Sequence, residues 1–241
     1  MLLLVSSPAF AAFTLIAGGA APWETSTNVV LDTTGANLIV VTISTWYSAA
    51  TFPHDYLGAN NNTACYVSAA KATNTGHLFT ETWYCLNPTY TGPSHGFYTD
   101  GGNFPFYVAA YSGAATSSVL DVGAISTNTT TGSTTIQPRS IIPACTNELV
   151  WFGYATEYPT WVSVSGVADA YHHAQTDTGG WKGYGVGTVL QTTAAAVNPT
   201  LTMSGSPYNG GGDSATVVAF KSASSSCGGA VTARHRVIGG E

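Results

Sequence analysis

The sequence has very little charge. Only 7 % of its 241 residues are Asp, Glu, Lys or Arg, against about a quarter in an ordinary soluble domain. Because nucleic-acid binding depends on Lys and Arg that neutralise phosphates, the net charge of −6 and the lack of a basic run exclude that class of partner. The surface must instead be built from Ser, Thr, Asn, Gly and Tyr, which stay hydrated but give little repulsion between copies of the chain.

Long apolar runs and amphipathic helices are also missing. Ser, Thr, Gly or Pro interrupts every apolar stretch before it reaches the 18 or so residues of a membrane-spanning helix. The i, i+3, i+4 apolar spacing of surface helices is absent as well, and residues 167–175 (VADAYHHAQ) are the best helix candidate. We therefore expect a chain built from strands, without a membrane span.

The sequence contains no motif for metal binding or nucleophilic catalysis. A zinc site needs a Cys-x-x-Cys pair or a close Cys/His cluster, and neither occurs. His172 and His173 are adjacent, so on a strand they would point to opposite faces. His54 and Asp55 are expected to pair within a loop; the alternative is that they contribute to a metal site, with calcium bound through Asp and Asn oxygens ahead of zinc. We expect no catalytic residue, no metal and no cofactor.

Short β-branched or aromatic runs bounded by Gly, Pro, Asn or Ser recur along the chain, as in antiparallel β proteins. Residues 37–44 (NLIVVTIS) are almost continuously apolar and predict a central strand covered on both faces. Residues 77–85 (HLFTETWYC) alternate and predict a half-exposed strand. Further strands are expected at residues 13–17, 64–70, 104–112, 148–155, 161–165, 185–193, 200–205 and 215–221. We predict an all-β fold, an antiparallel two-sheet β-sandwich of jelly-roll or Ig-like type with about ten strands.

The length fits one domain, since sandwiches often run to about 200–250 residues as a unit. We expect this domain at residues 12–223, an N-terminal arm at residues 1–11 and a C-terminal tail at residues 224–241. The arm lacks the basic residues of a secretory signal and contains an apolar run at residues 2–5. It is expected to dock on a neighbouring subunit as an added strand; the alternative is that it folds back on its own domain.

Four cysteines permit two disulfides in three connectivities. If they are oxidised, we expect Cys65 to pair with Cys85 across neighbouring strands and Cys145 to pair with Cys227, which would fasten the tail. The alternative is four buried thiols, because isolated cysteines behave as small apolar residues.

Aromatic residues at predicted strand ends or in loops are candidates for glycan contacts, because sugar rings stack on Trp and Tyr while their hydroxyls meet polar side chains. These candidates are Trp46, Tyr47, Tyr56, Tyr158, Trp161 and Trp181. Asn61 and Asn128 each begin an Asn-x-Thr sequon and are candidate glycosylation sites.

Five segments stand in consistent order between Phe13 and Ala223: LDTTGANLIVVTIS (31–44), YCLNPTYTGPSHGF (84–97), VAAYSGA (108–114), VLQTTAAAVNPTLTMSGS (189–206) and VVAFKSA (217–223). In them the chain resembles a widespread, poorly characterised group of β-sandwich proteins from phage structural modules and bacterial surface proteins. The resemblance implies a virion-surface or extracellular sandwich and no particular reaction. Residues 51–66 depart from the hairpin common in this group, which puts a shared ligand site in doubt.

The low charge and the lack of a catalytic constellation favour a non-enzymatic structural subunit. We expect a decoration, fibre or filament protein on a virion or outside the cell that assembles with copies of itself and contacts a capsid or a cell-surface glycan. The alternative is a carbohydrate-binding adhesin module that uses the exposed aromatic residues. A third hypothesis is a glycosidase-like enzyme, for which Glu81 is the acid to test.

Overall fold

The computed structural model describes residues 12–21, 28–46, 52–73, 78–100, 104–128, 134–157, 160–165, 171–176, 182–204 and 212–227. These residues form sixteen strands and one short 3-10 helix, η1 (Thr63–Cys65). The strands are β1 (Thr14–Ala21), β2 (Val29–Leu31), β3 (Leu38–Trp46), β4 (Pro53–Tyr56), β5 (Val67–Thr73), β6 (Leu78–Leu86), β7 (His95–Thr99), β8 (Phe106–Ser112), β9 (Leu120–Asn128), β10 (Thr135–Ile136), β11 (Glu148–Glu157), β12 (Thr160–Ser165), β13 (Tyr171–Thr176), β14 (Lys182–Gln191), β15 (Thr200–Ser204) and β16 (Asp213–Lys221). The expected arm at residues 1–11 lies outside the described residues.

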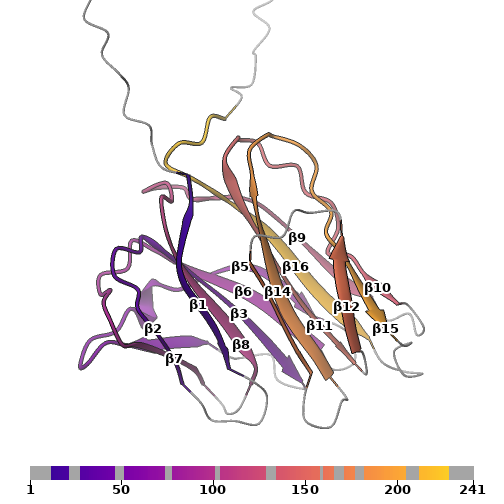
Figure 1. The fold of residues 1–241 in the computed structure, drawn as a ribbon, viewed down its shortest axis with the longest axis horizontal. Helices are drawn as coiled ribbons and strands as arrows, with labels where there is room; N and C mark the ends of the chain where they lie inside the picture. Colours follow the sequence, from indigo (N-terminus) through magenta and orange to yellow (C-terminus); the bar gives the residue numbers. More distant parts are fainter. Residues whose placement is uncertain are drawn as a thin grey trace, which may run out of the picture.

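The strands form four sheets. The first large sheet has the order β1-β8-β3-β6-β5, and the second large sheet has the order β13-β14-β11-β16-β9. The first small sheet is β2-β7-β4, and the second small sheet is β10-β15-β12. In Figure 1, β2 and β7 lie at the left edge and β10, β12 and β15 at the right, with the large sheets between them. All pairings within these sheets are antiparallel, which confirms the predicted all-β, antiparallel class.

The two large sheets pack face to face over a shared apolar core. Leu38 and Val40 of β3 point into this core from the first large sheet, and Trp151 of β11 and Phe220 of β16 meet them from the second. All four side chains are fully buried. Ile39, which alternates with Leu38 and Val40, belongs to a separate cluster on the outer face of the first large sheet. As predicted, β3 is a central strand covered on both faces.

Each small sheet covers the outer face of one large sheet. Phe97 of β7 packs in one cluster with Ile39 and with Val41 of β3. On the other side, Leu201 of β15 packs in one cluster with Tyr154 of β11. The described part of the chain therefore has more strands than the predicted ten or so, and two small sheets are added to the predicted pair. The unpredicted strands β2, β4, β7 and β10 are short, and their apolar positions are too few to stand out in the sequence. The nine-residue strand β9 (LDVGAISTN) was missed as well, because Gly, Ser, Thr and Asn interrupt its apolar positions.

One local prediction is wrong. β6 was expected to be half exposed, but it is largely buried, because Trp83 packs into the cluster beneath the first small sheet while Thr80 and Thr82 point into the interior. Residues 171–175 of the best helix candidate lie in strand β13, whose residues pair with β14 from Tyr171 to Thr176, in line with the expectation of a chain built from strands. Pairing with a neighbouring strand outweighs a weak local helix pattern.

A group of hydroxyl side chains also joins the two large sheets. Thr82 of β6 lies 3.0 Å (Oγ1 to Oγ1) from Thr42 of β3 and 2.8 Å from Thr216 of β16. The indole Nε1 of Trp151 donates a 2.7 Å hydrogen bond to Thr42 Oγ1. We call Thr42, Thr82, Thr216 and Trp151 the hydroxyl cluster. It satisfies buried polar groups in the interior, where an unpaired group would be destabilising.

Two disulfides pair the cysteines as predicted. The first bridge joins Cys65 to Cys85 and the second joins Cys145 to Cys227. One detail differs from the prediction, because Cys65 closes η1 and does not lie on a strand next to β6. The second bridge anchors residues 224–227, the described part of the expected tail. In the described chain, no helix has the length and apolar character needed to cross a membrane.

Candidate functional site

Three aromatic rings cluster on the exposed face of the first small sheet. His54 and Tyr56 alternate with buried residues on β4, and Tyr98 on β7 is the cross-strand partner of His54. The rings of His54 and Tyr98 are stacked at 5.0 Å between centroids, and those of Tyr56 and Tyr98 lie 6.1 Å apart. Tyr98 is 41 % exposed. We call His54, Tyr56 and Tyr98 the aromatic face.

Gly96 makes room for this arrangement. A Cβ atom added at Gly96 would lie 2.2 Å from Cζ of Tyr56. The tyrosine ring therefore lies directly over the β7 backbone, which only glycine permits at so short a distance. Tyr56 is held flat against the sheet.

Polar groups surround the rings. His54 Nε2 lies 2.5 Å from Oδ1 of Asp100, and Asn28 Nδ2 donates a 3.1 Å hydrogen bond to the hydroxyl of Tyr56. Rings with hydrogen-bonding groups at their edges are the combination that sugar-binding surfaces use.

Beneath the aromatic face, a buried polar network ties the first small sheet to the neighbouring loops. Asp55 of β4 accepts hydrogen bonds from the backbone N–H and side-chain amide of Asn62 and from the hydroxyl of Tyr66. Its Oδ2 lies 3.2 Å from Nε2 of His95. The other ring nitrogen of His95 lies 2.9 Å from Thr33 Oγ1. We call these five residues the Asp55 cluster.

The protonation of the Asp55 cluster follows from its contacts. Burial raises the pKa of Asp55, but hydrogen bonds from His95 and Asn62 and the proximity of His95 outweigh it and hold that pKa below its usual value. Burial, followed by the charge of Asp55, raises the pKa of Tyr66 well above its usual value. The cluster therefore contains a carboxylate beside a neutral tyrosine.

Thr33, His95 and Asp55 stand in the hydroxyl–imidazole–carboxylate order of a hydrolase triad. Thr33 and His95 are completely buried and Asp55 is 1 % exposed. The Thr33 hydroxyl accepts a hydrogen bond from Gly92 N–H at 3.1 Å. A substrate has no access to the Thr33 hydroxyl. The role that its contacts support is structural, since it holds the backbone at Gly92.

The polar residues that the sequence analysis singled out do not come together in one site among the described residues. His54 and Asp55 do not form one site, because alternation on β4 turns His54 to the surface and Asp55 inward. Glu81 is 8 % exposed, forms a 2.8 Å ion pair with Lys71 and accepts a hydrogen bond from Ser68. These contacts give Glu81 a role in fastening β5 to β6. For His172 and His173 only the β13 backbone lies within the description.

Of the six aromatic candidates, Tyr56 lies in the aromatic face. The side chains of Trp46 and Trp161 and all of Tyr47, Tyr158 and Trp181 lie outside the described residues. Asn61 is exposed and its side-chain oxygen accepts a hydrogen bond from Thr63 N–H, whereas the side chain of Asn128 lies outside the described residues.

Sequence reasoning missed Tyr98 and His54 as partners of Tyr56. The signal that could have found them is the alternation in residues 95–99 (HGFYT), where a strand pattern turns His95 and Phe97 inward and Tyr98 outward. The pairing with β4, which brings Tyr98 beside His54, is long-range and leaves no local trace in the sequence.

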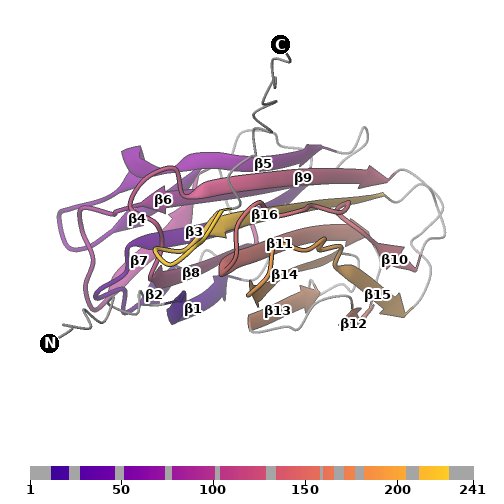
Figure 2. The same ribbon diagram turned by 90° about the horizontal axis from the view of Figure 1, so that it is seen from above.

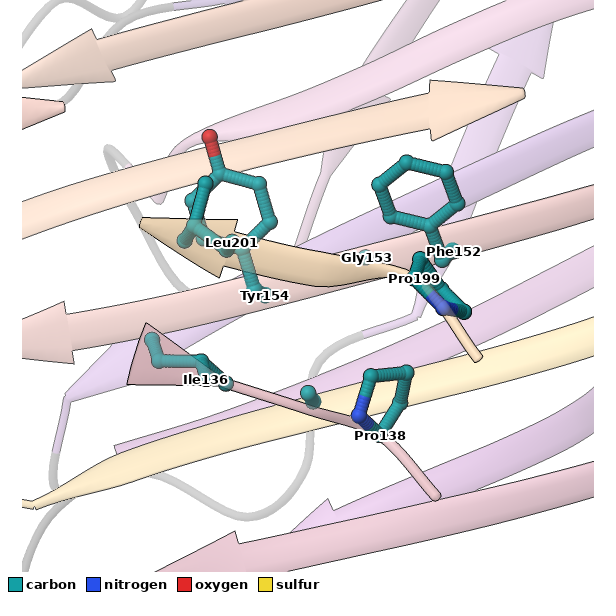
Figure 3. Close-up of a pocket in the computed structure, with 8 residues that line it drawn as sticks. Ile136, Pro138, Phe152, Gly153, Tyr154, Pro199 and Leu201 are labelled. Carbon is teal, nitrogen blue, oxygen red and sulfur yellow. The ribbon is translucent and has the colours of Figure 1, made fainter. Parts of the chain in front are cut away.

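A small apolar cavity lies between the second small sheet and the second large sheet (Figure 3). Its walls are Ile136, Pro138, Phe152, Gly153, Tyr154, Pro199, Leu201 and Ala215, and the space between them holds about one water molecule. Sites for organic ligands are much larger, usually about 300–1,000 Å³. We assign the cavity to imperfect packing between these two sheets.

No protein-family model matches the sequence, and no curated protein or solved structure is significantly similar to it. The resemblance to phage and bacterial surface proteins therefore stays a prediction.

Proposed function

We propose that the protein is a non-enzymatic structural subunit that works outside the cytoplasm, on a virion or cell surface, and assembles with copies of itself. Two disulfides support the location, because such bonds persist mainly in oxidising compartments. The scarcity of charge supports self-association.

The observation that carries this proposal is the difference between the two edges of the first large sheet. β5 bears Lys71, which pairs with Glu81, and lies beside β9 of the second large sheet (Figure 2), so this edge carries charge. β1 has no charged residue; it pairs with β8 alone among the described strands and contacts β2, and Leu15 on it is 39 % exposed. Natural proteins usually protect a free edge with charge, because its unpaired N–H and C=O groups recruit other strands.

The occupant that we propose for the β1 edge is the arm, residues 1–11, of a neighbouring copy. An added strand satisfies the free main-chain groups of β1, and the apolar run at residues 2–5 contributes side-chain contacts. A sandwich that binds the arm of its neighbour in this way forms a ring if successive rotations bring the last subunit back to the first, and an open filament if they do not.

Matched edge substitutions test the assembly. Leu15→Lys places a charge on the β1 edge, and Val67→Lys places one at a similarly exposed position of β5. We expect light scattering and electron microscopy to show assemblies for the native chain and Val67→Lys, and folded monomers for Leu15→Lys and for a chain without residues 1–11. Equal assembly by all four proteins, or a monomeric native chain, would contradict the proposal.

The aromatic face favours a second function, the binding of carbohydrate as an adhesin module. A tyrosine held flat over Gly96 presents its free side to a sugar ring, and Asn28, His54 and Asp100 provide polar partners beside it. Binding to a glycan array should be lost in Tyr98→Ala and kept in Tyr90→Ala, because Tyr90 is similarly exposed at 37 % and lies outside the aromatic face. Equal binding by both variants would reject this function.

A further inference from the structure

Two carboxyl groups meet next to the second disulfide. Glu148 is the first residue of β11, and Asp121 is the unpaired residue of a bulge where β9 runs along β16. Their carboxylate oxygens and the sulfur of Cys145 lie within 4.8 Å of one another. Glu148 is completely buried, while Asp121 is half-buried. The cross-strand partner of Glu148 on β16 is Lys221.

The two carboxyl groups have few hydrogen-bond donors. Glu148 Oε1 accepts the N–H of Cys145 at 3.1 Å, and Asp121 Oδ2 accepts the N–H of Ala144 at 2.7 Å. Glu148 Oε2 is buried and has no donor among the described residues. A second buried negative charge here would be poorly compensated. Among the described residues, Lys221 does not come close enough to Asp121 or Glu148 to form a salt bridge with either.

The bonds from Ala144 and Cys145 connect the acid pair to the end of the described chain. Cys145 is bonded to Cys227, and the adjacent Thr146 N–H donates to the carbonyl of Ser226 at 3.0 Å. The loop at residues 144–147 is therefore fastened to the acids on one side and to residues 225–227 on the other.

We propose that Asp121 and Glu148 share one proton in a carboxyl–carboxylate hydrogen bond, and that this bond is a pH-sensitive latch for the loop at residues 144–147 and its disulfide-linked segment. The proton gives Glu148 Oε2 the partner that it lacks. Loss of the proton places two negative charges side by side beneath the loop, and only Lys221, on the packed strand β16, opposes them.

The direction of the pH effect follows from the surroundings of Glu148. Burial, followed by the charge of Asp121, raises the pKa of Glu148 from 4.5 to about 7. An opened loop would return this group to water and to its ordinary value. The closed state therefore binds the proton more tightly, so acid favours closure and a rise in pH through about 7 favours opening.

A bound cation is the rival occupant of the gap between the acids. Calcium takes six to eight oxygen ligands, whereas the main-chain groups that approach this pair are the N–H donors of Ala144 and Cys145. The sulfur of Cys145 is already used in the disulfide. The donor set therefore favours a proton.

Reduction of the two disulfides in one molecule tests the latch. The full chain is treated with a phosphine reductant at acid and alkaline pH, free thiols are trapped by alkylation, and mass spectrometry follows each bridge. The Cys65–Cys85 bridge is the internal control, because it also joins a fully buried cysteine to a more accessible one.

We expect the reduction rate of Cys145–Cys227, divided by that of the control bridge, to rise between about pH 5.5 and about pH 8.5 by up to about thirtyfold, the linkage limit for full rehydration of the pair. Glu148→Gln, which keeps a hydrogen bond to Asp121 without a titrating proton, should abolish this rise. In Asp121→Asn, which removes the neighbouring charge, the rise should be smaller and should level off at lower pH, and this variant serves if Glu148→Gln fails to fold.

Three outcomes would overturn the latch. The first is a rate ratio that does not change with pH in the native chain, and the second is a rise that persists in Glu148→Gln. The third is suppression of the rise by millimolar calcium in the native chain, which would assign the gap to a cation.

Discussion

The Asp55 cluster and the Asp121–Glu148 pair place the same chemical group, a carboxyl, in equally buried surroundings with opposite results. Asp55 is 1 % exposed and Glu148 is completely buried. Asp55 receives two hydrogen bonds from Asn62 and one from Tyr66, and it lies beside His95. Glu148 receives one main-chain hydrogen bond and faces another acid.

The hydrogen-bond donors around a buried carboxyl, and not its degree of burial, therefore decide whether it is charged. Burial raises the pKa of both groups. Donors to Asp55 reverse this effect and keep it ionised, whereas the charge of Asp121 adds to it at Glu148. One buried acid is therefore a fixed part of the structure, and the other titrates near neutrality.

The largest expected effect is the removal of Asp55. Asp55→Ala leaves the donors of Asn62 and Tyr66 and the ring of His95 without their acceptor, and breaking a buried pair of this kind costs about 3–5 kcal/mol. Urea unfolding near neutral pH should show this loss. Asp32→Ala is the control, because Asp32 is exposed nearby and accepts a hydrogen bond from Thr34. A loss in free energy of unfolding that is no larger in Asp55→Ala than in Asp32→Ala would contradict the predicted contribution of the Asp55 cluster.

The second-largest expected effect concerns Glu148, whose contribution to the free energy of unfolding falls as pH rises. Because the pKa of Glu148 is raised to about 7, its favourable contribution is complete below about 4.5 and is lost as pH rises through about 7. Glu148→Gln should therefore exceed the native chain in free energy of unfolding by about 3 kcal/mol near pH 9, by about 1 kcal/mol near pH 5, and match it near pH 4. The measurement is chemical denaturation across this range. A difference that is the same at both ends would refute ionisation as the cause.

The smallest expected effect concerns one donor to Asp55. Tyr66→Phe removes a single hydroxyl, whose hydrogen bond to Asp55 is 3.2 Å long, and leaves Asn62 and His95 in place. The expected loss is about 1 kcal/mol. Tyr90→Phe is the matched control, because Tyr90 is an exposed tyrosine. The same denaturation assay should separate the two variants, and a loss as large as that of Asp55→Ala would show that the donors act as an inseparable unit.

Much of the fold followed from residue patterns. The apolar run at residues 37–44 predicted the central strand β3, and the positions of the four cysteines led to the observed pairs. Periodicity works for such elements because burial on both faces, or on one, leaves a regular trace in the sequence. The shortest strands left little trace, because β2 has three residues and β10 has two, whereas β12 and β15 of the second small sheet coincide with predicted strands.

The two carboxyl clusters could not have been predicted. Asp55 meets His95 across forty residues of chain, and Glu148 meets Asp121 only because a bulge in β9 displaces Asp121 from its register with β16. The aromatic face was found in part, through Tyr56. Its other members depend on the pairing of β4 with β7, and such long-range register is not encoded in any local pattern.

The hydroxyl cluster has a mechanical consequence. Apolar side chains tolerate a sideways displacement, because dispersion contacts depend weakly on direction, whereas hydrogen bonds weaken steeply when their angle changes. Thr82 binds Thr42 in its own sheet and Thr216 in the opposite one, and Trp151 reaches back from the second large sheet to Thr42. A force that slides one large sheet across the other must break the two inter-sheet bonds of this cluster at once. The hydroxyl cluster therefore resists sliding of the two large sheets past each other.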